Sequence, residues 1–212
     1  MKRSCAPFVA ILLVGVLHAA RAEAQSGSGG GAAGRVAGDL GLQADLGCAL
    51  AGGDTALFAR ATVRYLQTAG IYATYLDGLR ERQGPSSRSV SLGIELRPLF
   101  LPRSGLDLER GPAWLDLLVD SISLRLGAVV SRQPHYEPIA PGLEAGLGIG
   151  LPLTRSASGP WIDASAAIRL SDAQLAHRDG FELDRATVFT LTLGWQGIVG
   201  AHVVDAGDRM RR

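Results

Sequence analysis

Apolar and polar residues alternate along most of the chain, most clearly between Ser89 and Pro98. Every second residue from Val90 to Leu96 is apolar, and the residues between them are serine, glycine and glutamate. Successive side chains of a β-strand point to opposite faces, so a period of two residues indicates a strand. We expect this segment to form a strand with one hydrocarbon face and one polar face.

The same alternation occurs in seven further segments, separated by stretches rich in turn-forming residues. It predicts eight strands, of which the third is shorter and semi-apolar on both faces. The eight segments are 38–50, 58–66, 70–76, 89–98, 120–130, 142–153, 161–171 and 187–197. An even number of antiparallel strands can close on itself without leaving an edge. We therefore predict an all-β fold, an eight-stranded antiparallel up-and-down barrel over residues 36–199.

Two kinds of closed barrel fit this pattern. A soluble, lipocalin-like barrel points its apolar face inward around a ligand, whereas an outer-membrane barrel points it outward at lipid. The polar face carries acids and arginines in equal number and no lysine; arginine's planar fork suits a crowded interior. We therefore favour a transmembrane barrel with a polar lumen. The charged residues are Asp39, Asp45, Arg60, Arg64, Glu95, Arg97, Arg125, Glu144, Asp163 and Arg169.

The lumen of an eight-stranded barrel is narrow and filled by side chains. Unpaired charges there would cost several kcal/mol each, so the balanced signs predict ion pairs. For Glu95 the candidate partners are Arg64, Arg97 and Arg125. We interpret these charges as a structural plug that specifies the closed barrel; an ion or proton path is the alternative.

The first 25 residues have the layout of a secretory signal peptide. Lys2 and Arg3 precede an apolar run that is too short to span a bilayer, and small residues follow it. Cleavage is expected after Ala22 or Ala24. The predicted organisation is a signal peptide (1–24), a Gly/Ser-rich linker (25–35), the barrel (36–199) and a polar C-terminal tail (200–212).

Composition narrows the function of the exported chain. Of 21 basic and 20 acidic residues, cleavage after Ala24 leaves 18 and 19, a net charge of −1. This balance, without a basic patch, argues against nucleic-acid binding. Cys5 leaves with the signal, so Cys48 has no intrachain partner and a disulfide framework is excluded.

The sequence predicts no catalytic site, no cofactor and no metal site. His135 and His177 fall in expected outward loops and His202 in the tail, and the H-x-S arrangement of lipid A deacylases does not occur. The segment from His177 to Asp184 also contains Asp179 and Glu182. Its spacing matches no metal-ligand template, so we interpret it as a solvated loop.

Topology assigns the connections to the two sides of a membrane. With both termini periplasmic, residues 77–88, 131–141 and 172–184 lie outside the cell, where rigid barrels usually carry recognition loops. The connection 99–120 is then periplasmic and unusually long, and we expect an interfacial helical turn within 109–120. The aromatic residues expected at strand ends on this side are Tyr65, Phe100, Trp161 and Trp195.

At this level the chain resembles the small eight-stranded outer-membrane proteins of Gram-negative bacteria, such as the transmembrane domain of outer membrane protein A and outer membrane protein X. The segments "ELRPLFLPR" and "LDLERGPAWLDLLVDSISLRLGA" look like outer-membrane barrels of myxobacteria, and the resemblance covers residues 36–199. It implies a monomeric outer-membrane barrel without shared catalytic residues, in contact with membrane lipid and, through its outer loops, with an extracellular or envelope partner. The implied roles run from envelope integrity to adhesion. A periplasmic lipocalin-like binder is the alternative, and a lipid-modifying enzyme the third hypothesis.

Overall fold

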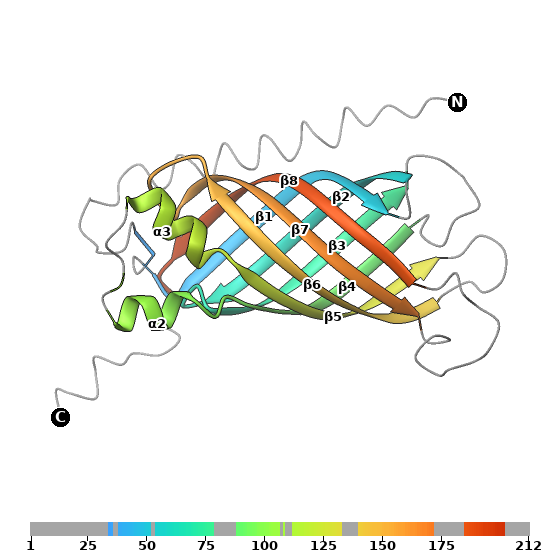
Figure 1. Cartoon of the computed structure of the whole chain (residues 1–212), viewed down its shortest axis with the longest axis horizontal. Helices are drawn as coiled ribbons and strands as arrows, with labels where there is room; N and C mark the ends of the chain where they lie inside the picture. The colour runs from blue at the N-terminus through green and yellow to red at the C-terminus, as the bar shows by residue number, and fades with distance from the viewer. Residues whose placement is uncertain are drawn as a thin grey trace.

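The computed structural model describes residues 34–35, 38–51, 54–78, 88–106, 108, 112–132, 140–171 and 185–201. Antiparallel strands form a closed barrel in which each strand pairs with its neighbours in the chain and the last pairs with the first (Figure 1). The strands are β1 (Leu40–Ala51), β2 (Asp54–Tyr65), β3 (Ala69–Gly78), β4 (Arg88–Leu96), β5 (Ser123–Arg132), β6 (Ala140–Pro152), β7 (Gly159–Ser171) and β8 (Arg185–Val199). The predicted eight-stranded up-and-down barrel is confirmed.

One strand differs from the expectation. β3, predicted to be short, has 10 residues and is longer than β4, which has 9. The outward residues Ile71, Ala73 and Tyr75 and the inward residues Tyr72, Thr74 and Leu76 continue the alternation of its neighbours. Its semi-apolar character on both faces therefore reflects inward-pointing Tyr72 and Leu76 rather than a weak strand.

The two ends of the barrel differ in their connections. Strand pairing places Leu40, Tyr65, Ala69 and Leu96 at one end, together with the turn 66–68 and two helices between β4 and β5. We call this the helical end. The opposite end, the loop end, is where residues 52–53, 79–87, 133–139 and 172–184 connect the strands; these segments lie outside the described residues.

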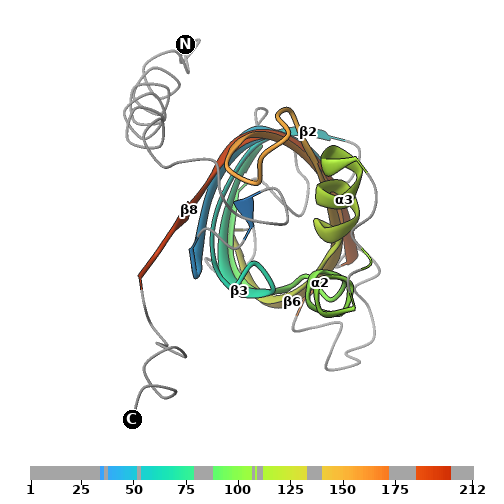
Figure 2. The same cartoon turned by 90° about the vertical axis from the view of Figure 1, so that its left-hand side faces the viewer.

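The long connection between β4 and β5 forms α2 (Phe100–Gly105) and α3 (Ala113–Asp120). Both lie at one side of the barrel opening, where α3 packs on β6 (Figure 2). The hydroxyl of Ser121 exchanges hydrogen bonds of 2.8 Å with the backbone of Gly150 and so attaches the end of α3 to β6. Among the described residues, no helix is long and apolar enough to cross a membrane.

The alternation sorts side chains between the outside and the lumen. Leu92 and Leu191 are 62% and 61% exposed, whereas Ser91 and Thr192, one residue away, are 1% and 2% exposed. The large apolar side chains exposed on the strands are Leu42, Leu50, Val63, Ile71, Tyr75, Val90, Leu92, Ile94, Leu96, Leu124, Leu126, Val130, Leu143, Leu147, Ile149, Leu151, Ile168, Phe189, Leu191, Leu193 and Val199. The barrel is therefore apolar outside and polar inside.

Two small apolar clusters close the lumen around its polar middle. At the loop end, the inward residues Phe58, Leu76 and Val188 pack with Ala49 and Ala56. At the helical end, Leu117 of α3 packs with Ala157 and Trp161. Trp161 and Phe100 were expected among aromatic residues at the strand ends, but both are buried. Trp161 lies two residues before Asp163 and so on the inward face of β7, and Phe100 packs beside Arg35 at the start of α2.

Candidate functional site

The charged side chains of the lumen form three contiguous clusters, and the first surrounds Glu95 near the end of β4. Arg64 of β2 and Arg125 of β5 place their Nε atoms 2.6 and 2.8 Å from opposite carboxylate oxygens of Glu95. The Nε atom of Arg97, just after β4, lies 3.5 Å from the same carboxylate. The structure thus brings together Glu95 and the three arginines that the sequence offered as its partners.

The second cluster joins β1, β2 and β7. Nη2 of Arg60 lies 2.7 Å from Asp45 and 3.0 Å from Asp163. The amide of Gln43 donates hydrogen bonds of 2.7 and 2.8 Å to the same two carboxylates. A Cβ atom on Gly194, opposite Asp45 in β8, would overlap the Asp45 carboxylate, so glycine makes room for this cluster.

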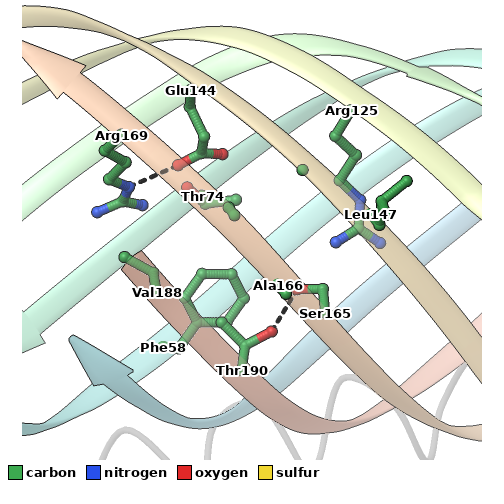
Figure 3. A pocket seen from close by; sticks show the side chains of 12 residues that line it. Phe58, Thr74, Arg125, Glu144, Leu147, Ser165, Ala166, Arg169, Val188 and Thr190 are labelled. Atoms are coloured by element: carbon green, nitrogen blue, oxygen red, sulfur yellow. Dashed lines mark hydrogen bonds and ion pairs between the residues drawn. The ribbon is translucent and has the colours of Figure 1, made fainter. Parts of the chain in front are cut away.

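The third cluster joins Glu144 of β6 and Arg169 of β7 to polar side chains of β3 and β4. Arg169 donates from Nε to Glu144 at 2.6 Å (Figure 3) and from Nη1 to the Ser89 hydroxyl at 2.7 Å. Glu144 also accepts hydrogen bonds from the hydroxyls of Tyr72, at 3.2 Å, and Ser91, at 3.3 Å. Both oxygens of this buried carboxylate are therefore used.

A small cavity adjoins the third cluster on the side of the loop end. Its volume is about 20 Å³, and Phe58, Val188, Arg125 and Glu144 are among the residues that line it (Figure 3). That volume accommodates about one water molecule. Ligand pockets are of the order of 300–1,000 Å³, so this cavity is too small for an organic ligand.

A fourth group of charges closes the helical end. Arg103 of α2 contacts Asp116 and lies 2.8 Å from Asp120, both on α3. Arg35 forms an ion pair with Asp120, and its guanidinium lies 5.2 Å from the centre of the Phe100 ring. Arg35 is 4% exposed. Arg35, the last residue of the expected linker, therefore packs against α2 and α3.

Asp39 is the member of the predicted charge set that lies outside these clusters. It precedes β1 at the rim of the helical end, where its carboxylate accepts a hydrogen bond from the backbone N–H of Ala201. The alternation predicts an inward position for Asp39, but β1 begins only at Leu40. We therefore assign Asp39 to the rim.

Several contributors to the clusters were missed by the search for charged residues. Gln43, Tyr72 and Ser91 bond to lumen carboxylates, and Gln196 accepts a hydrogen bond of 3.3 Å from Arg64. All of them occupy inward positions of the alternating pattern, so a search for hydrogen-bonding residues at those positions would have found them. Arg35 precedes the first strand, and no periodic signal marks it.

Metal and catalytic sites were not expected from the sequence. In the described part of the chain, no group of three or more His, Cys, Asp or Glu side chains is placed to hold a metal ion. His135, His177, His202 and the segment from His177 to Asp184 lie outside the described residues. Cys48 is exposed on the outward face of β1 as a free thiol.

Comparison with known proteins yields a likeness among solved structures. No family model and no curated protein matches the chain. Among solved structures, the chain is similar to the attachment invasion locus protein Ail of Yersinia pestis, crystallised with the heparin analogue sucrose octasulfate. The identity is 12% and the TM-score 0.38, and the match covers 75% of this chain and 97% of Ail. A likeness at this level carries no information about function.

Proposed function

We propose that the chain is an outer-membrane β-barrel with a plugged lumen and a structural or surface-interaction role. The observation that carries this proposal is the inverted polarity of the barrel. Large apolar side chains are exposed on every strand, whereas the ionised side chains of the lumen are buried. Soluble monomers rarely expose a continuous apolar surface of this extent, but a bilayer requires one.

The same observation counts against a soluble small-ligand binder. A lipocalin-like barrel needs its apolar face inside, around a ligand cavity. Here the inward face carries ion pairs, and the cavity beside Glu144 has room for about one water molecule. Because side chains fill the lumen, a structural role for its charges is favoured over conduction through a wide channel.

Orientation follows from the two ends of the barrel. We assign the helical end to the periplasm and the loop end to the cell exterior, where residues 79–87, 133–139 and 172–184 would meet an extracellular or envelope partner. On the helices, Leu101, Trp114 and Leu115 are exposed. Tryptophan and leucine at such a position suit the boundary between lipid headgroups and acyl chains, so α2 and α3 would rest on the inner leaflet.

A pair of arginine substitutions on the outward face of β8 tests the membrane assignment. Leu191→Arg places a charge on the outward face and should reduce insertion or destabilise the barrel by ~2–4 kcal/mol near the bilayer midplane. Thr187→Arg places the same charge on the outward face near the loop end of β8, where the cost should fall to ~0–1 kcal/mol. Recovery of barrel from the outer-membrane fraction after detergent extraction measures both. A soluble periplasmic parent protein, or the reverse order of effects, would overturn the proposal.

Epitope tags test the orientation separately. A tag inserted at Gly180, between β7 and β8, should be labelled on intact cells. A tag after Arg212 should be labelled only when the outer membrane has been permeabilised. Labelling of the C-terminal tag alone on intact cells would reverse the assignment of the two ends.

A further inference from the structure

The charges inside the barrel do not sum to zero. In the middle of the lumen, the three acids Asp45, Glu95 and Asp163 are accompanied by four arginines. Those arginines are Arg60, Arg64, Arg97 and Arg125. The third cluster is balanced, with Glu144 against Arg169, and so is the helical end, with two arginines against two aspartates. The described side chains therefore leave one surplus positive charge in the middle of the lumen.

The arginines of the middle are crowded as well as in excess. Arg64, Arg97 and Arg125 all contact the single carboxylate of Glu95, so their like charges repel one another. Arg125 also fills the space next to Gly148, where a Cβ atom would lie 2.8 Å from its Nη2 atom. Side-chain rearrangement has little room to separate these guanidiniums, because all four are buried.

Three buried polar atoms on β2 have unused hydrogen-bonding capacity. Nη1 of Arg60, Oγ1 of Thr62 and Nη2 of Arg64 are buried and have no hydrogen-bond partner among the described residues. These residues alternate along one strand, so all three side chains enter the lumen from the same face. A buried donor without a partner is strongly unfavourable, and a buried charge without a counter-charge is more so.

Water in the lumen would satisfy the donors but would leave the surplus charge uncompensated. A small monovalent anion would satisfy the donors and also compensate the charge, because it accepts several hydrogen bonds and carries one negative charge. We propose that the middle of the lumen binds one halide-sized monovalent anion through Arg60, Thr62 and Arg64 of β2. The anion is a structural counter-ion of the plug, and chloride is the natural occupant.

Thermal unfolding of the full mature chain in detergent tests this site. Chloride or bromide should raise the Tm in a saturable way, by about 5–10 °C at concentrations far above its Kd. Gluconate at the same ionic strength is too large to enter and should have no such effect. Equal Tm values in chloride and gluconate would overturn the proposal, whatever the location of the barrel in the cell.

Two variants remove the site in different ways. Thr62→Val removes a donor at nearly constant volume and should weaken the apparent halide affinity at least several-fold. Arg97→Gln removes the surplus charge, so the Tm of this variant should be the same in chloride and in gluconate. The Arg97 side chain has the longest contacts of the four arginines, 3.5 Å to Glu95 and 3.5 Å to Gln43, so the barrel should still fold.

Thr190→Val is the matched control, because this inward hydroxyl is already bonded to Ser165. It should leave the halide response unchanged. An unchanged response in Thr62→Val or Arg97→Gln would overturn the proposal. So would crystals grown in bromide that show no anomalous peak beside Arg60 and Arg64; a peak at that position would support it.

Discussion

Phe58, Leu76 and Val188 fill the loop end of the lumen, and all three come from the strands themselves. Toward the helical end, the lumen is filled by ion pairs around Glu95, and α2 and α3 lie at one side of the opening (Figure 2), where Arg35 and Arg103 pair with Asp120. One end is closed by apolar contacts, which are insensitive to charge. The other combines the apolar cluster of Leu117, Ala157 and Trp161 with ion pairs, so its stability also depends on charge.

The largest effect is expected at Glu95. Glu95→Gln removes the shared carboxylate of three arginines and leaves their charges unpaired in a buried site. We expect a loss of about 3–5 kcal/mol in the free energy of unfolding, measured by urea titration in detergent. A loss below about 1 kcal/mol would mean that the pairing around Glu95 contributes little to the barrel.

At the loop end, Phe58→Ala should leave a cavity that the surrounding strands cannot fill. The expected loss is about 3 kcal/mol, and it should not depend on salt concentration because no charge is involved. Phe189→Ala is the matched control, since Phe189 is 55% exposed on the outward face. A salt-dependent loss for Phe58→Ala, or an equal loss in both variants, would contradict an apolar closure of this end.

A smaller effect is expected where α3 meets Arg35 and Arg103. Asp120→Asn removes one of two carboxylates, but Arg103 keeps its contact with Asp116. We expect a loss of about 1–3 kcal/mol, because Arg35 and Arg103 each lose an ion pair with Asp120. Limited proteolysis should then cut the chain near residue 35 faster than in the parent. An unchanged cleavage rate would show that Asp120 does not hold this segment.

The smallest effect is expected for the exposed pair between Asp77 and Arg88 at the loop end, with Nε 3.2 Å from Oδ1. Its side chains are 30% and 55% exposed, so water and salt screen the attraction. Asp77→Asn should change the unfolding free energy by less than about 1 kcal/mol in the same urea titration. A loss as large as that of Glu95→Gln would remove the distinction between buried and exposed pairs.

The sequence predicted the strands and their faces because each depends on neighbours two residues apart. It also predicted the partners of Glu95, since alternation limits them to inward arginines. It could not predict that Gln43 bonds to Asp163, 120 residues away, because that contact exists only after β8 has paired with β1. Nor could it place Arg35 or Phe100, which lie outside the strands, where no alternation applies. Trp161 shares the inward face of Asp163 in β7, so the alternation did indicate its direction.

The charge clusters also bear on how the barrel assembles. Glu95 takes partners from β2 and β5, and Arg60 of β2 bridges residues of β1 and β7, so partners are distributed around the whole circumference. A partly formed sheet would expose these charges at an open seam beside the lipid. Strand-by-strand insertion is therefore unfavourable until the seam between β1 and β8 closes, and intermediates should be sparsely populated. Folding and closure become one cooperative event, in which side chains far apart in sequence meet at the same moment.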